Sequence, residues 1–205
     1  MSPEELAQLH FDAVANGNAA SAHRVIHPEH VNHMAADEPP ACRLPGVPGL
    51  MATSAWLRSA FTGLRFDVIE MVSADDRTLA HVWMRGAQTG PFVIFPNGKP
   101  VAFAPTRREV AVRQCHIFRL RDGMHAEHIS VRDDLGMMTQ LGHLPPSPAA
   151  IARMARWTLS GRAKRAAAAA IALSSTAARE VTQTIAAGRL IRQQDRCWPR
   201  TQHSA

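Results

Sequence analysis

The chain has 205 residues, 46% of them apolar and 20% charged, with a net charge of +6 at pH 7. This length and composition suit one packed domain with additional chain, and they exclude a wholly disordered protein. The longest uncharged apolar-rich stretch, Ala166 to Ala178, has 13 residues, whereas a bilayer span needs about 20, so we expect no stable membrane insertion. The acidic start, MSPEEL, is unlike a signal peptide, and a cytoplasmic protein is therefore expected.

The positive charge is concentrated at the end of the chain. From Ser147 onward there are ten Lys and Arg residues and two acids, a net charge of +8 that leaves −2 for residues 1–146. The tail holds only two aromatic residues, Trp157 and Trp198, which are too few for base stacking, so no nucleic-acid partner is expected. The three cysteines are widely spaced and form no CxxC pair, which argues against a disulfide framework or a thiolate zinc site.

Prolines at Leu144–Pro148 divide the chain into a domain, residues 1–146, and a basic, Ala-rich tail, residues 147–205. Helical spacing in the domain predicts helices at Pro3–Ala15, with Ser2 as its cap, and at Ala19–Ile26 and Ser54–Thr62. The segment between the last two, Pro39–Gly49, is expected to be a loop.

The tail contains strong helix formers at Ile151–Arg165 and Ala166–Leu190. Three interpretations stay open for it: a solvated or partly disordered extension, a helix docked on the domain or on a partner subunit, and an interfacial contact with membrane or nucleic acid.

From Leu64 the apolar period changes to 2, which predicts strands separated by turns. The predicted strands are Arg65–Ser73, Arg77–Arg85, Val101–Phe103, Glu109–Leu120 and His125–Arg132. Helices followed by an antiparallel meander indicate an α+β fold, and the absence of alternating strands and helices disfavours a dinucleotide-binding fold. No glycine-rich phosphate-binding motif is present either.

Two of these strands carry polar groups on otherwise apolar faces. In Glu109–Leu120, the alternating face is apolar except for Gln114 and His116. In the next strand, the face that includes Ile129 and continues to Asp133 mixes apolar residues with carboxylates. If both faces line the concave side of one curved sheet, these groups converge in an apolar pocket of the kind that binds small molecules.

The segment IFRLRDGMHAEHISVRDDLGMMTQLG, residues 117–142, is similar to the signature of the SnoaL-like polyketide cyclases, or ester cyclases. Supporting pieces lie upstream in HPEHVNH (27–33), MRGAQTGPF (84–92) and PTRREVAVRQCHIFR (105–119). The resemblance covers roughly residues 4–146 and implies a nuclear transport factor 2-like cone, with helices packed on a curved antiparallel sheet. By analogy it also implies a homodimer formed through the open sheet face.

This resemblance further implies a reaction. Characterised cyclases of the family close a ring in a hydrophobic aromatic polyketide ester by intramolecular aldol condensation, with an aspartate as general acid/base and no metal or organic cofactor. The aspartate lies seven residues before the Gln of the QLG motif, a spacing that selects Asp133.

The resemblance also implies substrate-binding residues. Gln114 and His116 match its Gln-x-His pair, and Asn32 or His33 matches a pocket position near the end of the second helix. Phe118 and Ile129 supply apolar surroundings, which would raise the pKa of a carboxyl group toward the working range. Enolate oxygens could accept hydrogen bonds from Gln114 and His116.

Each site residue also has a structural interpretation. Asp133 could cap a helix or pair with Arg132, His116 could be a hydrogen-bonded core residue, and Glu127 is expected to pair with a neighbouring arginine. Three nearby histidines at three-residue spacing start at His27, but Pro28 interrupts a regular helix there, so no metal site is expected.

Two alternative functions stay open: a non-catalytic binding or accessory dimer module, and a hydrolase or isomerase that uses the same pocket.

Overall fold

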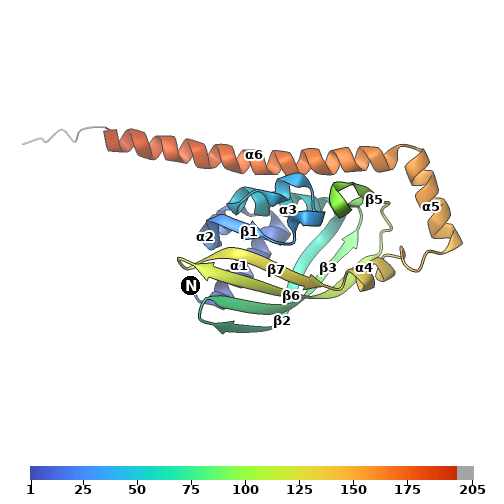
Figure 1. The fold of residues 1–205 in the computed structure, drawn as a ribbon, viewed down its shortest axis with the longest axis horizontal. Helices are drawn as coiled ribbons and strands as arrows, with labels where there is room; N and C mark the ends of the chain where they lie inside the picture. The colour runs from blue at the N-terminus through green and yellow to red at the C-terminus, as the bar shows by residue number, and fades with distance from the viewer. Residues whose placement is uncertain (198–205) are drawn as a thin grey trace, which may run out of the picture.

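A computed structural model describes the backbone of residues 1–197 and the side chains of residues 1–188 (Figure 1). The fold is α+β, as the sequence predicts, with one curved five-stranded sheet in the order β1-β7-β6-β3-β2 and a small sheet formed by β4 and β5. The helices are α1 Pro3–Asn16, α2 Ala19–Val25, α3 Gly46–Ala60, α4 Asp134–Gln140, α5 Pro148–Leu159 and α6 Arg162–Cys197, with short 3-10 helices η1 Ala35–Asp37, η2 Pro40–Arg43 and η3 Pro96–Gly98. The strands are β1 Ile26–Asn32, β2 Phe61–Ala74, β3 Arg77–Gln88, β4 Phe92–Ile94, β5 Val101–Phe103, β6 Glu109–Arg121 and β7 Met124–Arg132.

The predicted first helix is confirmed together with its cap. The Ser2 hydroxyl accepts a hydrogen bond from the Glu5 amide, and the Glu5 carboxylate accepts one from the Ser2 amide, which satisfies two donors at the helix start. Gly17 ends α1 in the left-handed conformation, at φ 69°. The buried face of α1, which includes Leu6 and Phe11, covers the sheet.

The loop prediction for Pro39–Gly49 is wrong at its end, because α3 begins at Gly46, eight residues before the predicted start at Ser54. Proline and glycine in the sequence Gly-Val-Pro-Gly favour a loop, yet a proline in the first helical turn loses no helical hydrogen bond. A side chain at Gly49 would collide with the Leu44 carbonyl oxygen. The small residue therefore lets the start of α3 lie directly against the preceding chain.

The five predicted strands are confirmed as β2, β3, β5, β6 and β7, with small differences at their ends. The sequence missed β1, which follows α2 directly and pairs with β7 in parallel, so the sheet is not a pure antiparallel meander. It also missed β4 and α4. A strand of mixed polar residues with a proline, such as HPEHVNH, has too little alternation to be distinguished from a loop.

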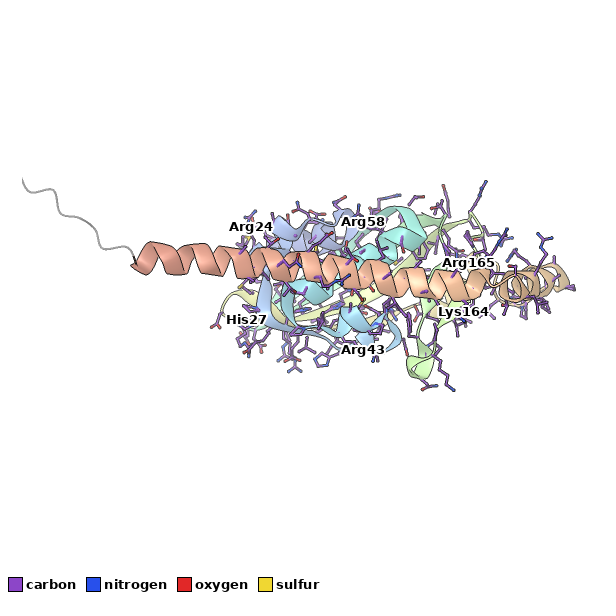
Figure 2. The ribbon with its side chains drawn as sticks, turned by 90° about the horizontal axis from the view of Figure 1, so that it is seen from above. Arg24, His27, Arg43, Arg58, Lys164 and Arg165 are labelled. Atoms are coloured by element: carbon purple, nitrogen blue, oxygen red, sulfur yellow. The ribbon has the colours of Figure 1, made fainter. Side chains whose placement is uncertain are left out.

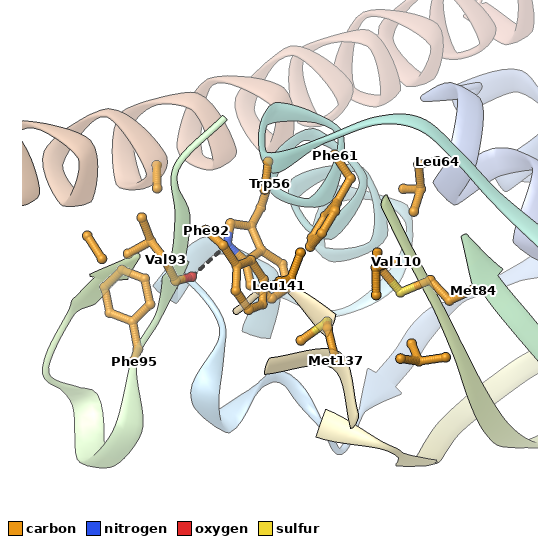
Figure 3. Packing of buried hydrophobic residues seen from close by; sticks show 14 of the residues in the cluster. Trp56, Phe61, Leu64, Met84, Phe92, Val93, Phe95, Val110, Met137 and Leu141 are labelled. Atoms are coloured by element: carbon orange, nitrogen blue, oxygen red, sulfur yellow. Dashed lines mark hydrogen bonds between the residues drawn. The ribbon is translucent and has the colours of Figure 1, made fainter. Parts of the chain in front are cut away.

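The main core cluster lies between α3, the sheet and α4 (Figure 3). Trp56 of α3 stacks on Phe92 with ring centroids 5.5 Å apart, and its indole nitrogen donates a 2.8 Å hydrogen bond to the Val93 carbonyl oxygen. Met137 and Leu141 of the α4 segment pack into the same cluster. These contacts fix α4 against the end of the sheet.

Residues 148–197 contain the two helices α5 and α6, and α6 crosses α3 on the side away from the sheet (Figure 1). Its small residues Ala167, Ala170 and Ala178 are buried against the domain, and Val181 joins a second core cluster that α1, α2, β1 and α3 form. Viewed from above, basic side chains of the domain, such as Arg24 and Arg43, lie on both sides of α6 (Figure 2). Trp198 and the last part of the tail lie outside the described residues.

Within residues 1–197, we find no helix that combines the length and the apolarity needed to cross a bilayer.

Candidate active site

An internal cavity lies between the concave face of the sheet and the helices. It consists of two adjoining chambers that share Glu38, Leu57, Met84, Gln114 and Arg132. The outer chamber, about 160 Å³, extends from Trp56 and Phe92 to the exposed residues Asp37 and Asp134. The inner chamber, about 70 Å³, is closed by α1 and reaches the histidines of β6 and β7. Most of the lining is apolar, so the few polar groups at the junction dominate its chemistry.

The cavity face of β6 is the one that the sequence predicts, because Val112, Gln114 and His116 point inward. The predicted face of β7 is wrong by one residue. In the antiparallel pairing, Gln114 lies opposite Arg132 and His116 opposite Ser130. Residues opposite each other share a face, so the second strand presents even-numbered residues to the cavity.

This register carries Ile129 to the outer face of the sheet, opposite Ile117, and Val131 is 69% exposed there. Glu127 lies on that face as well, and its carboxylate is 2.9 Å from the His33 ring. Glu127 therefore contacts the histidine that follows β1, and the ion pair expected with a neighbouring arginine is not found among the described residues. Neither Ile129 nor His33 lines either chamber.

Asp133 lies at the N-terminus of α4, where its Oδ1 accepts a 2.8 Å hydrogen bond from the Gly136 amide. Its side chain is exposed and is not among the described groups that line the cavity. The neighbouring Asp134 does line the outer chamber and lies 3.5 Å from Arg132. The structure thus brings Gln114, His116 and Asn32 to one cavity and leaves Asp133 outside it.

Phe118 is fully buried beneath the cavity and contributes packing. Its ring stacks on His125 at 4.3 Å and on His128 at 5.2 Å, and it also contacts Phe11. Phe118 therefore holds the histidines that surround the inner chamber.

A buried carboxyl group that the sequence did not single out lies at the junction of the chambers. Glu38 is 3% exposed, and the Thr53 hydroxyl donates a 2.7 Å hydrogen bond to its Oε2. Burial raises the pKa of Glu38, and the Thr53 hydrogen bond and the nearby charge of Arg132 only partly oppose this shift. A carboxyl group with a raised pKa in a cavity is typical of an acid/base residue.

Arg132 is the cation of the cavity and lines both chambers. Its only ion pair among the described residues is the 3.5 Å contact between Nη2 and Asp134. Its Nε–H is buried and has no hydrogen-bond partner within the described part of the chain. A buried donor without a partner loses its hydration without compensation, so this group is available to a ligand oxygen.

Four side chains form a hydrogen-bonded row along the inner chamber. His116 Nε2 lies 3.0 Å from Gln114 Oε1, His116 Nδ1 lies 2.9 Å from His128 Nε2, and His128 Nδ1 lies 3.2 Å from Asn32 Oδ1. Burial lowers the pKa of His116 to about 3 and that of His128 well below its usual value, so both rings are neutral.

Neutral rings define the direction of this row. Asn32 Oδ1 already accepts from the Met34 amide, so His128 Nδ1 must carry its proton and donate to Asn32. His128 Nε2 then accepts from His116 Nδ1, which leaves His116 Nε2 as an acceptor. His116 Nε2 then needs a donor, and the Gln114 amide supplies one if its oxygen and nitrogen exchange places. In that orientation the amide nitrogen donates to His116, and the carbonyl oxygen faces Met84 and the cavity. Gln114 is therefore best suited to accept a hydrogen bond from a ligand, in contrast to the donor role expected from the sequence.

The sequence contained a usable signal for two of the missed groups. A shift of one residue in the face of β7 would have selected His128 and Arg132. Glu38 had no such signal, because it lies in an irregular stretch between η1 and η2, before Pro39 and Pro40. Only the folded chain brings this loop beneath α3 and beside β7.

The curved sheet, closed by N-terminal helices over an internal cavity, defines an α+β cone of the nuclear transport factor 2-like class. The sequence matches the SnoaL-like polyketide cyclase domain over residues 4–141, and the chain belongs to that family. This membership indicates a cyclase-type domain that binds a small molecule.

Solved structures agree with this assignment. TsrD from Streptomyces laurentii is 25% identical, with a TM-score of 0.58 over 69% of this chain and 95% of its own. A candidate SnoaL-like polyketide cyclase from Jannaschia sp. CCS1 is 23% identical, with a TM-score of 0.56 over 70% of this chain and 93% of its own. A protein with a ketosteroid isomerase-like fold from Catenulispora acidiphila is 12% identical, with a TM-score of 0.51 over 69% and 95% of the two chains. No curated protein matches the sequence.

Proposed function

We propose that this protein performs acid/base chemistry of the aldol type on a hydrophobic carbonyl compound, and that Glu38 transfers the proton. The observation that carries the proposal is a carboxyl group that is 3% exposed, forms no ion pair with the described residues, and lies at the junction of two apolar chambers. Burial raises the pKa of Glu38 toward the range in which one carboxyl group can act first as base and then as acid.

The proposed step is an isomerisation that closes a ring. The Glu38 carboxylate removes a proton from the carbon beside a carbonyl group, and the electron pair of that C–H bond forms an enolate. The enolate carbon then attacks a second carbonyl carbon of the same molecule, and the new alkoxide takes the proton back from Glu38. Every atom comes from the substrate or from Glu38, so the proposal keeps the expectation that no cofactor is needed.

Other groups of the cavity support this step. The positive charge of Arg132, which lines both chambers, favours the negative charge that develops on the enolate. The Gln114 carbonyl oxygen can accept a hydrogen bond from a substrate hydroxyl group. The apolar walls, including Trp56 and Phe92, exclude water and bind the ring system.

Proton removal can be tested before the natural substrate is known. The measurement is the uptake of deuterium from heavy water at the carbon beside the carbonyl of 2-tetralone, followed by NMR with and without the protein. We expect catalysed exchange in the wild type, and a loss of roughly 10²- to 10⁴-fold in Glu38→Gln, the range associated with a positioned acid/base group.

Asp133→Asn is the matched comparison, since the family resemblance assigns the same role to Asp133. We expect its exchange rate to stay within about twofold of the wild type, because this side chain is exposed and caps α4. Exchange that is lost in Asp133→Asn and kept in Glu38→Gln would return the role to the aspartate. Exchange that is absent from every variant and the wild type, with binding retained, would support a non-catalytic binding module.

We also propose a homodimer formed through the outer face of the sheet. Leu79, Ile117 and Ile129 occupy one row across three adjacent strands on that face, and Val131 lies beside them at 69% exposure. A contiguous exposed apolar surface is typical of an interaction site. Light scattering should give a dimer for the wild type and a monomer for Ile117→Lys.

A further inference from the structure

We propose that Arg132 recognises a carboxylate group on the substrate, so that the protein acts on a free acid and not on an ester. This inference rests on the proposed function for the site, because it names the substrate class of the same cavity. It requires an anion-binding group that faces the cavity, room for the anion, and a charge balance that tolerates it.

The first requirement is met by the guanidinium of Arg132. The side chain lines both chambers from the pocket face of β7, opposite Gln114. Its Nη2 makes one long contact, 3.5 Å, with Asp134, while its Nε–H is buried without a partner among the described residues. A guanidinium presents neighbouring N–H groups in a fixed fork that matches the two oxygens of a carboxylate.

The second requirement concerns space. Arg132 and Glu38 face the same two chambers but form no ion pair with each other in the described structure. A ligand group that binds the guanidinium therefore breaks no ion pair between these two side chains. The inner chamber, about 70 Å³, holds a small substituent only, so the ring system of such a ligand belongs in the outer chamber near Trp56 and Phe92.

The third requirement concerns the charge of the cavity. Its described acidic groups are Asp37, Glu38 and Asp134, of which the two aspartates are exposed at the outer chamber. Glu38 is the acidic group nearest the proposed position of the anion, and its burial favours the neutral, protonated form. In that form Glu38 adds no repulsion when the anion binds, and the nearby positive charge of Arg132 offsets the second negative charge once Glu38 ionises to act as the base.

The test compares two ligands that share one ring system, the anion 2-naphthoate and its neutral methyl ester, methyl 2-naphthoate. Dissociation constants are measured by NMR titration for the wild type, for Arg132→Gln, and for Arg113→Gln as the control. Arg113 lies on the outer face of β6 with its guanidinium 4.9 Å from the Trp83 ring, so it tests the loss of an arginine charge away from the cavity.

We expect the acid to bind the wild type more tightly than the ester does, and to bind Arg132→Gln at least tenfold more weakly. The affinity of the ester should change less than threefold in both variants, and that of the acid should be unchanged in Arg113→Gln. Equal affinities of acid and ester for the wild type, or an equal loss for both in Arg132→Gln, would overturn the proposal.

A second measurement does not depend on the folding of a variant. The Nε–H signal of Arg132 in the wild type should move downfield when 2-naphthoate is added and stay in place with the ester. An acid that binds without moving this signal contradicts the proposal. Because these readouts are binding and chemical shift, they remain informative if no turnover is ever found. Catalysed exchange that is lost in Glu38→Gln, together with equal affinities of the wild type for acid and ester, would leave proton transfer by Glu38 intact and exclude this inference.

Discussion

The carboxyl group of Glu38 costs the folded protein free energy whenever it is ionised, because it is 3% exposed and has no ion-pair partner among the described residues. Asp133 presents the opposite case, since its carboxylate is exposed and satisfies an amide at the start of α4. Ionised Glu38 therefore lowers the stability of the fold, whereas Asp133 stabilises the start of α4. This difference can be measured independently of catalysis.

Glu38→Gln should be more stable than the wild type at neutral and alkaline pH. The folded pKa of Glu38 is raised, so its contribution to stability is fully present below the unfolded value of 4.5 and is lost as the pH rises toward the folded pKa. In that interval, the advantage of the glutamine variant should grow by about 1.4 kcal/mol for each pH unit. Urea unfolding at pH 5 and pH 8 tests this, with the exposed Glu109→Gln as a control that should show no such gain.

Asp133→Ala should lose about 1 kcal/mol of stability, because it removes the hydrogen bond to the Gly136 amide, whereas Asp133→Asn should stay near the wild type, since asparagine is an equally good cap. Thermal unfolding of the two variants provides the comparison. Equal losses in both would indicate that the negative charge at this position matters for stability beyond the cap itself.

At the scale of elements, α6 extends the family domain with a helix that packs through small side chains. Ala167 and Ala170 lie 7% and 6% exposed in the main core cluster, and Ala178 lies against the loop segment that includes Cys42. Alanines let the helix axis approach α3 closely, while its opposite face remains exposed. This packing makes α6 a cover over the helix that forms one wall of the cavity.

A charge placed on the buried face of α6 should therefore be costly, and the same charge on its exposed face should not. We expect Ala170→Glu to lose about 2–4 kcal/mol and Ala169→Glu less than about 0.5 kcal/mol, because the two substitutions have the same helix propensity and differ only in burial. Urea unfolding of the pair measures the difference. Similar losses for both would mean that α6 does not dock in solution.

At the scale of the whole molecule, buried histidines make stability depend on pH. His10, His30, His116 and His125 are all less than 7% exposed, and His30 Nε2 and His125 Nε2 have no hydrogen-bond partner among the described residues. Burial lowers the pKa of His30 to about 4 and that of His125 to about 3. The fold is therefore built around neutral imidazole rings.

The protein should lose stability in mild acid. Below pH 6.5, the unfolded chain binds protons at these histidines while the folded chain does not, so stability falls from pH 6.5 toward the folded values of about 3 to 4. Each such histidine contributes up to about 1.4 kcal/mol per pH unit.

Unfolding of His125→Phe between pH 7 and pH 4.5 tests this dependence. The variant keeps an aromatic ring against Phe118 and should show a shallower fall in stability than the wild type, whereas the exposed His23→Phe should keep the wild-type slope. A slope that is the same in all three proteins would assign the acid sensitivity to other groups.

Sequence patterns predicted much of the fold and part of the site. The cap at Ser2, the alternation along β6 and the signature in residues 117–142 identified the first helix, the central strand and the family, because each signal is local. The same local signals selected Gln114, His116 and Asn32, all of which line the cavity. They failed at β7, where one residue of register exchanges the two faces and moves Ile129 outward and Arg132 inward.

What the sequence by itself determined is the class of fold and the strand that carries the polar pair, since periodicity and motif spacing are properties of neighbouring residues. Only the tertiary structure decided which carboxyl group faces the cavity. Glu38 comes from an irregular loop, is held by Thr53 of α3 and lies near Arg132 of β7, and the burial that raises its pKa arises from elements far apart in the chain. Burial and charge proximity are properties of the packed molecule, and no local pattern encodes them.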